Sequence, residues 1–236
     1  MMATASDPHD GLPVAAAGAP LAEARAAAIL LHGRGGTARD ILGLARELDR
    51  PGVAWLAPQA AGNTWYPNSF LAPLESNQPH LDSALAAVAR LVDRVAAEGP
   101  GVGQLALIGF SQGACLALEA AARQGRRLGA VAGLTGGLIG PPGTARDYAG
   151  SLAGTLVFLG AGDPDPHVPW SRVEETAEVF ERLGAVVDAR RYPGLPHTIN
   201  QDELRRVDEY LAALVAGGEG AATSAAAAPA AGRRPG

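Results

Sequence analysis

The sequence predicts an α/β fold in which helices cover both faces of a mostly parallel central sheet. Short apolar runs alternate along the chain with amphipathic segments of about 10–15 residues, whose apolar positions recur with a helical period. Buried parallel strands joined by helical crossovers have this pattern. The 236 residues, 47% of them hydrophobic, can form one sizeable core and are too few for two ordinary domains.

Six apolar runs are the expected strands. They are residues 26–31, 53–57, 105–108, 128–135, 155–159 and 186–192. In parallel sheets of this kind, ligands bind beyond the carboxyl ends of the strands. We therefore expect the functional residues in the loops at that edge.

The expected helices lie between these strands and after the last one. They cover residues 37–48, 79–95, 114–121, 171–183 and 200–214. Thr37 with Asp40, and Asn200 with Glu203, have the spacing of capping pairs at helix starts.

The two ends of the chain are expected to lie outside the domain, which we place at residues 11–216. Residues 1–10 are expected to be loose, as chain ends often are. Residues 217–236 contain no large apolar side chain and are rich in Ala and Gly. This composition predicts a disordered tail.

The composition argues against several classes of function. The net charge of −5 provides no basic surface for nucleic acid. All 19 basic residues are arginine, which excludes a Schiff-base lysine and a P-loop lysine. The single cysteine, Cys115, cannot form an internal disulfide and is interpreted as a packed core thiol.

The location of the protein is predicted from missing signals. No apolar run reaches the roughly 20 residues that span a bilayer. The first ten residues, MMATASDPHD, lack the basic and apolar regions of a signal peptide. We therefore expect a cytoplasmic protein with no membrane span.

The most informative motif is the G-x-S-x-G run at residues 109–113. It follows the apolar run 105–108 and precedes a helical pattern, which is the context of a nucleophile elbow, a sharp strand-to-helix turn that exposes a serine. Gly109 and Gly113 are expected where strand and helix pass too closely for a side chain. Ser111 is the candidate nucleophile.

A serine nucleophile needs a base, and His197 is the candidate. His197 lies in the loop between the last strand and the last helix, so the chain order serine, acid, histidine expected for this type of sheet is available. The other four histidines are assigned to other places. His9 is in the loose terminus and His32 ends a strand, while His80 is on the surface of a helix and His167 is in the acidic loop. For the acid, Asp163 and Asp165 both lie in the loop after the strand 155–159, and spacing alone does not rank them.

An oxyanion hole would need two backbone N–H donors. One is expected from Gln112, directly after the serine, and the other from Arg34 in the glycine-rich run 32–36 that follows the first strand. A phosphate-binding loop is the alternative for this run, and it lacks both the G-x-G-x-x-G pattern and a lysine.

The long loop between Pro58 and Pro79 is the candidate substrate wall. It contains Trp65, Tyr66 and Phe70, and loops of this length in compact domains are often functional. Two interpretations remain open: these aromatic side chains line an acyl pocket, or they pack over the edge of the sheet.

Five motifs together resemble the phospholipase/carboxylesterase family of α/β-hydrolases, which includes the acyl-protein thioesterases. They are L-H-G-R-G-G at 31–36, W-Y-P at 65–67, G-F-S-Q-G at 109–113, D-P-H-V-P at 165–169 and P-G-L-P-H-T-I at 193–199. They occur in order at family-like spacing, and the resemblance covers nearly all of residues 25–215. It is strongest to bacterial members described only as hydrolases or esterases.

The resemblance implies a minimal α/β-hydrolase fold without a large cap domain. It implies that Ser111, His197 and Asp165 form a catalytic triad, because the family acid lies in D-P-x-V-P, and that Gln112 and Arg34 supply the oxyanion donors. Thioesterase-type members have His-Gly where this chain has Ala161-Gly162. Long-chain protein deacylation is less strongly implied for that reason.

The sequence therefore predicts a serine carboxylic ester hydrolase that acts through an acyl-enzyme on small to medium esters. It is expected to need no metal and no cofactor. The alternatives are an acyl-thioesterase or lysophospholipase, a dienelactone-type hydrolase, which usually has cysteine at the elbow, and a non-catalytic binding module. A homodimer is compatible with the resemblance, because related enzymes often dimerise.

Overall fold

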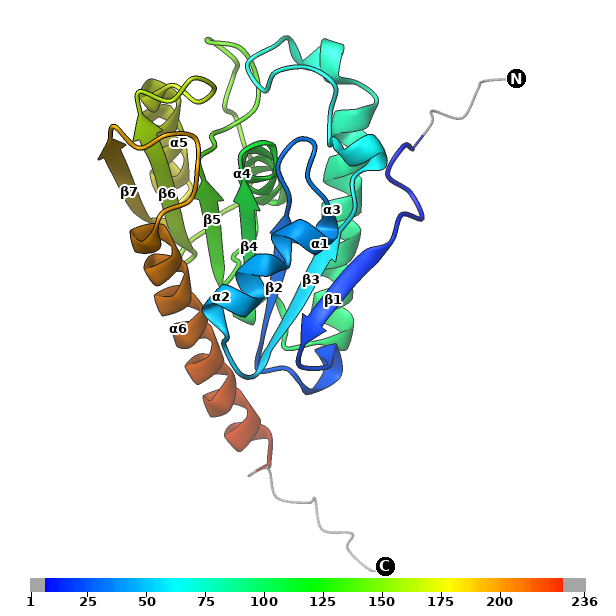
Figure 1. Ribbon diagram of the computed structural model, residues 1–236. Helices are drawn as coiled ribbons and strands as arrows, with labels where there is room; N and C mark the ends of the chain where they lie inside the picture. The colour runs from blue at the N-terminus through cyan, green and yellow to red at the C-terminus, as the bar shows by residue number, and fades with distance from the viewer. Residues whose placement is uncertain (1–6, 227–236) are drawn as a thin grey trace, which may run out of the picture.

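The computed structural model describes residues 7–226 and is built around a seven-stranded sheet in the order β1-β3-β2-β4-β5-β6-β7 (Figure 1). The pair β1–β3 is antiparallel and the other neighbouring pairs are parallel. The strands are β1 Val14–Gly18, β2 Ala26–Leu31, β3 Val53–Pro58, β4 Leu105–Phe110, β5 Ala130–Leu134, β6 Leu156–Asp163 and β7 Val186–Pro193.

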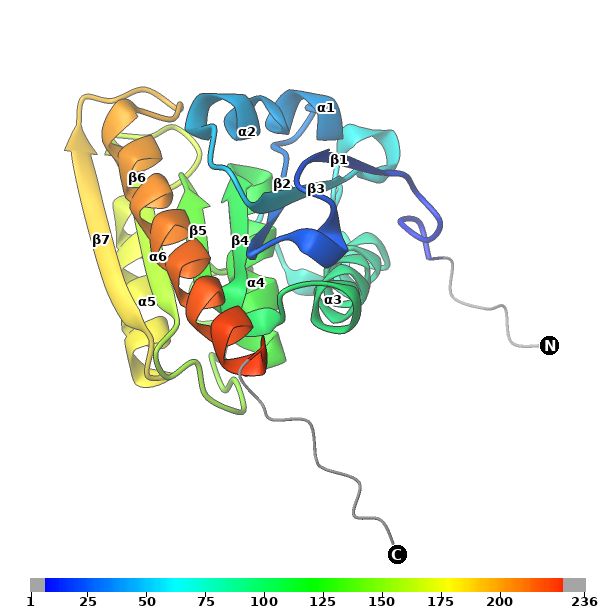
Figure 2. The ribbon, with the colours of Figure 1, turned by 90° about the horizontal axis from the view of Figure 1, so that it is seen from below.

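Helices cover both faces of this sheet (Figure 2). In the described residues they are α1 Ala38–Ile41, α2 Gly43–Leu48, α3 His80–Glu98, α4 Gln112–Gln124, α5 Trp170–Arg182 and α6 Gln201–Ala226. Buried side chains of α3, α4 and α5 form one core cluster with one face of the sheet, and those of α1 and α6 form a second cluster with the other face. The predicted fold class is confirmed: this is the α/β-hydrolase architecture.

All six predicted strands are present, and β1 is an additional strand that the sequence analysis did not predict. β1 has the sequence VAAAG, and four of its five residues are exposed. It therefore shows neither a buried apolar run nor a clear alternation of apolar and polar residues, the two signals by which strands are recognised. Its pairing with β3 at the edge of the sheet identifies it only in three dimensions.

The predicted helix 37–48 is divided into α1 and α2 at Leu42. The predicted capping pair is present: the Thr37 hydroxyl accepts a bond from the Asp40 backbone N–H at 3.2 Å, and the Asp40 carboxylate accepts one from the Thr37 N–H at 2.9 Å. α2 begins at Gly43, and glycine is a poor helix former, which favours a break at this position.

The N-terminal boundary of the ordered chain differs from the prediction. Residues 7–10 were expected to be loose, yet His9 is buried, and its backbone N–H donates to the Ser83 hydroxyl at 2.8 Å. Its ring nitrogens bond to the Trp65 carbonyl at 2.9 Å and to the Ala61 N–H at 3.0 Å. These bonds join chain segments far apart in sequence, so no local pattern could indicate them. Residues 1–6 lie outside the described part of the chain.

The C-terminal boundary also needs correction. α6 continues to Ala226, whereas the tail from residue 217 onward was predicted to be disordered. Residues 227–236 lie outside the described part of the chain. Within residues 7–226, no helix combines the length and hydropathy needed to cross a bilayer.

The strand order places two loops side by side. β2 and β4 are neighbours, with Leu31 opposite Gly109, because the chain passes from β2 outward to β3 and then returns to the other side of β2. Such a reversal of strand order is where open α/β sheets bind ligands. The loop after β2 and the turn after β4 therefore meet at the carboxyl edge of the sheet.

Candidate active site

Ser111 lies on the turn between β4 and α4, in a backbone conformation that residues other than glycine rarely adopt. Its φ is +54°, which is the strain expected of a nucleophile elbow. A Cβ atom at Gly109 would lie 2.1 Å from the Gly113 carbonyl oxygen, and one at Gly113 would lie 2.1 Å from the Leu31 carbonyl oxygen. The predicted crowding at both glycines is confirmed.

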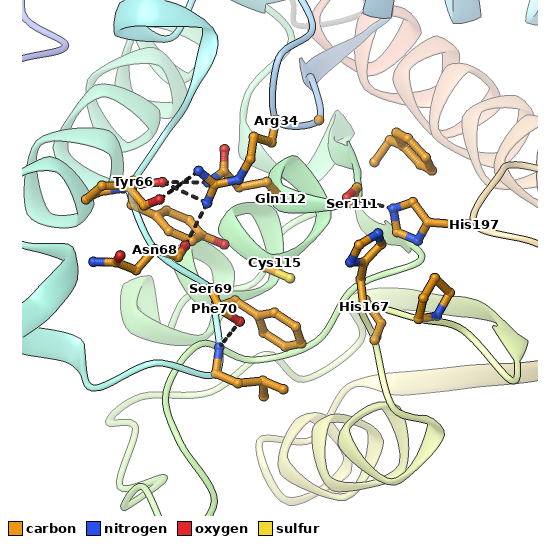
Figure 3. A pocket seen from close by; sticks show the side chains of 16 residues that line it. Arg34, Tyr66, Asn68, Ser69, Phe70, Ser111, Gln112, Cys115, His167 and His197 are labelled. Carbon is orange, nitrogen blue, oxygen red and sulfur yellow. Dashed lines mark hydrogen bonds between the residues drawn. The ribbon is translucent and has the colours of Figure 1, made fainter.

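Three predicted residues form one hydrogen-bonded chain. The Ser111 hydroxyl and His197 Nε2 are 2.8 Å apart (Figure 3). On the other side of the imidazole, His197 Nδ1 is 2.8 Å from Asp165 Oδ2. An ionised carboxylate can only accept, so Nδ1 carries the imidazole proton and Nε2 is left to accept from the serine. This arrangement lets the imidazole remove the hydroxyl proton.

Asp165 is held as a carboxylate in a buried position. Burial acts to raise its pKa, but bonds to Oδ1 from the backbone N–H of His167 and Val168, both at 2.8 Å, and the His197 imidazole at Oδ2 outweigh this effect, so the pKa is lowered. Asp163, the competing acid, forms an exposed ion pair with Arg191 instead.

His197 reaches Ser111 because its loop crosses the ends of the neighbouring strands. A Cβ atom at Gly162, near the end of β6, would lie 2.1 Å from the Leu195 carbonyl oxygen. Further along, the Thr135 hydroxyl after β5 is 3.5 Å from the Thr198 carbonyl oxygen. The loop thus rests on β6 and β5 and brings the imidazole from the edge strand β7 to the elbow.

The other histidines lie where they make different contacts. His32 follows β2 as expected and is buried. Its Nε2 accepts from the Ala60 N–H at 3.1 Å, and its Nδ1 bonds the Gly33 carbonyl at 2.8 Å. His80 is in the first turn of α3, half-buried rather than on the surface as predicted, and its ring is edge-on to that of His9 at 6.2 Å.

The predicted oxyanion donors border Ser111. Gln112 is the first residue of α4, where backbone N–H groups have no acceptor inside the helix. A Cβ atom built on Gly33 would lie 3.5 Å from Ser111 Cβ. The loop after β2 therefore contacts the serine at Gly33, the residue that precedes Arg34. The loop that contains Arg34 therefore lies against Ser111, and the partial positive charge at the start of α4 favours an anion there.

The side chains of Arg34 and Gln112 have a role that sequence reasoning missed. The Arg34 guanidinium donates to the carbonyl oxygens of Tyr66, Pro67 and Asn68 at 2.6–3.0 Å (Figure 3). The Gln112 amide accepts from the Trp65 N–H at 3.0 Å and donates to the Tyr66 carbonyl at 2.8 Å. The two residues expected to stabilise the oxyanion through their backbones thus fasten the aromatic loop with their side chains.

A cavity of about 680 Å³ opens at Ser111. Of the three aromatic residues predicted to line it, Tyr66 and Phe70 do so and Trp65 does not. Trp65 is buried in the core, where its indole N–H donates to the His32 carbonyl at 2.9 Å and its ring packs on the His32 ring. The prediction that Trp65 contacts substrate is therefore wrong, because its indole is buried in the core.

The floor of the cavity contains the buried side chains of Tyr66 and Cys115 (Figure 3). Burial raises the pKa of the Cys115 thiol to about 12. The thiol is therefore protonated and unreactive at neutral pH, in agreement with its interpretation as a packed core residue.

Two further residues touch the imidazole of His197. The ring of His167 is edge-on to it at 4.9 Å, and the ring of Phe110 lies 5.3 Å away. Both line the cavity. The available signal was that both residues lie in the same short motifs as Asp165 and Ser111, D-P-H-V-P and G-F-S-Q-G.

Comparisons with known proteins match most of the chain. The family model for Phospholipase/Carboxylesterase matches residues 13–215. A phospholipase/carboxylesterase of Dyadobacter fermentans, known from its crystal structure, is 44% identical with a TM-score of 0.82, and the superposition covers 89% of this chain and 99% of that one.

Two curated relatives are more distant in sequence. The protein of Arabidopsis thaliana named "Probable carboxylesterase SOBER1-like" is 24% identical over 206 residues, which are 80% of this chain and 78% of the relative. "Acyl-protein thioesterase 1" of Gibberella zeae is 33% identical over 114 residues, which are 46% of this chain and 47% of the relative. The second match thus spans about half the length of either protein.

Proposed function

The chain belongs to the phospholipase/carboxylesterase family and is an ester hydrolase, and from this premise we propose that it is a serine carboxylesterase that works through an acyl-enzyme. The observation that carries the proposal is the chain of two 2.8 Å hydrogen bonds from Ser111 through His197 to Asp165 at the cavity. These are the contacts that a serine, a base and an orienting acid need.

In the proposed reaction, His197 takes the proton of Ser111 while the serine oxygen attacks the acyl carbon. The backbone N–H groups of Gln112 and Arg34 bind the oxyanion, and Asp165 stabilises the imidazolium. His197 then gives the proton to the departing alcohol. Water, activated by the same imidazole, releases the acid and restores the serine.

The cavity supports small to medium acyl groups. Its volume of about 680 Å³ lies in the range of small-molecule sites, and Tyr66, Phe70, Leu71 and Val168 provide apolar walls. Hydrolysis of acyl thioesters is the second candidate, supported by the similarity to an acyl-protein thioesterase. It would use the same five residues, so the two activities differ in the leaving group.

A series of p-nitrophenyl esters from acetate to palmitate tests the proposal, with Ser111→Ala as the control. We expect turnover of short and medium esters that the variant loses. A long-chain optimum would instead favour the lipid or thioester activity, and a matched ester and thioester of one acid would separate these. Turnover that survives in Ser111→Ala would contradict the role of this serine.

A further inference from the structure

A second hollow of about 400 Å³ adjoins the cavity at Ser111. We call it the α1–α2 groove, because residues of these two helices form one of its walls. Its lining is His32, Gly33, Arg34, Gly36, Asp40, Ile41, Gly43, Leu44, Glu47, Phe110 and Ile199. Gly33, Arg34 and Phe110 also line the cavity, so the two hollows adjoin at these residues.

The groove has an apolar surface and acidic groups. Ile41, Leu44, Phe110 and Ile199 provide the apolar part, and all four pack against the core cluster under α1 and α6. Asp40 and Glu47 add two carboxylates to the lining.

The positive charge of Arg34 is committed elsewhere. Its guanidinium donates to the carbonyl oxygens of residues 66–68, which belong to the cavity side. The apolar side chains of the groove therefore favour an apolar group, and its two carboxylates disfavour an anionic one.

The chemistry of acyl transfer requires space on two sides of the serine. The ester carbon carries an acyl chain and an alcohol oxygen, and both are present until the C–O bond to the alcohol breaks. The alcohol must leave on the side of the imidazole, which supplies its proton. Phe110 lies 5.3 Å from the His197 ring, and Ile199 follows His197 by two residues, so the groove begins on that side.

We propose that the α1–α2 groove binds the alcohol portion of the ester, and that this alcohol is apolar and uncharged. The inference rests on the proposed esterase function. As the Ser111 Oγ–carbon bond forms and the ester C–O bond breaks, the serine proton passes through His197 to the alcohol oxygen. The free alcohol then leaves through the groove, while the acyl group stays in the cavity.

Two leucine-to-tryptophan variants form a matched test. Leu44→Trp fills the groove, and Leu71→Trp fills the cavity. For each protein we would measure kcat/KM by acid release for methyl butyrate, benzyl butyrate and methyl octanoate. The benzyl-to-methyl ratio reports the alcohol side, and the octanoate-to-butyrate ratio reports the acyl side.

We expect Leu44→Trp to lower the benzyl-to-methyl ratio by about tenfold or more and Leu71→Trp to lower the octanoate-to-butyrate ratio, since a hydrophobic subsite discriminates by about 10–200-fold. If Leu44→Trp does not fold, Leu44→Ala should raise the benzyl-to-methyl ratio. A 4-carboxybenzyl ester should react more slowly than the benzyl ester in the wild type.

Two results have different meanings. Ser111-dependent hydrolysis with a benzyl-to-methyl ratio that neither Leu44 variant moves, or a carboxybenzyl ester as good as the benzyl ester, would overturn the groove proposal and leave the esterase function intact. Wild-type protein that releases no acid from any ester would overturn the esterase function and the groove proposal with it.

Discussion

At the scale of single residues, two neighbouring aspartates have opposite environments. Asp165 has a fully buried carboxylate that bonds two backbone N–H groups and His197. Asp163 is two residues away and forms an exposed ion pair with Arg191. Exposed ion pairs contribute little to stability, whereas a buried carboxylate on an imidazole sets the tautomer of that imidazole.

The two aspartates should therefore differ sharply when each is changed to asparagine. In Asp165→Asn, we expect kcat to fall by about 10⁴-fold, as is typical when a triad acid becomes an amide and the imidazole adopts the wrong tautomer. In Asp163→Asn, kcat should change by less than about threefold, because only an exposed pair is lost. Steady-state hydrolysis of one ester measures both, and equal losses would contradict the assignment.

Cys115 lines the cavity yet should be chemically silent. Its raised pKa of about 12 leaves almost no thiolate at pH 8, and its side chain is buried. We expect iodoacetamide to leave the folded protein unlabelled and active over a time in which the urea-unfolded protein is fully labelled, as mass spectrometry would show. Rapid labelling of the folded protein with loss of activity would refute this interpretation.

At the scale of elements, the site depends on how closely β2, β4 and α4 approach one another. The strands end with Leu31 opposite Gly109, and α4 starts directly over them. Gly109 and Gly113, at the two ends of the motif, allow the strands and the helix to lie this close. The close packing brings the loop after β2 against Ser111. The motif thus encodes a packing geometry as well as the proposed nucleophile.

A pair of glycine-to-alanine variants tests this geometry. The methyl group of Gly113→Ala would lie 2.1 Å from the Leu31 carbonyl oxygen, a backbone atom that cannot move alone. We expect a loss of at least about 3 kcal/mol in the free energy of unfolding. Gly43→Ala at the start of α2 is the control, because no atom lies within 4 Å of its added methyl group. It should change stability by no more than about 1 kcal/mol. Equal urea midpoints would contradict the argument.

At the scale of the whole molecule, one buried carboxyl links stability to pH. Glu203 is fully buried in the first turn of α6. One of its oxygens accepts from the Asn200 N–H at 2.8 Å, as the predicted capping pair requires, and the other has no hydrogen-bond partner in the described part of the chain. Burial raises the pKa of Glu203 from 4.5 to about 7.

The direction of the pH effect follows from this raised pKa. The folded protein holds the proton more tightly than the unfolded chain, so the contribution of Glu203 is complete below about pH 4.5 and is lost as the pH rises to about 7. Over that range the loss is on the order of 3 kcal/mol.

Glu203→Gln removes the titration and keeps an acceptor for Asn200. We expect the unfolding free energy of the variant, relative to the wild type, to increase between pH 4.5 and pH 8 by up to about 3 kcal/mol in urea titrations. The other carboxylates are unchanged in both proteins, so their effects cancel in the difference. A difference that does not vary with pH would contradict the burial of an ionisable carboxyl.

Much of the fold could be predicted from the sequence because each strand and helix carries its own pattern of burial. The runs 26–31 and 105–108 are apolar throughout, since both faces of β2 and β4 are covered. β1 lacks such a pattern because four of its five residues are exposed. This strand was therefore missed, as was the attachment of His9 through bonds to Ser83, Trp65 and Ala61, which are distant in sequence.

For the site, the sequence by itself determined which chemistry was available: a serine between two crowded glycines, a histidine before the last helix and two candidate acids. Only the tertiary structure decided which side chains meet. It placed Asp165 against His197, turned the indole of Trp65 into the core and fastened the aromatic loop with Arg34 and Gln112. The physical reason is that the pattern of apolar residues that marks a strand or helix lies within one short segment of the chain. These contacts instead join segments more than 30 residues apart, which the order of the strands brings together.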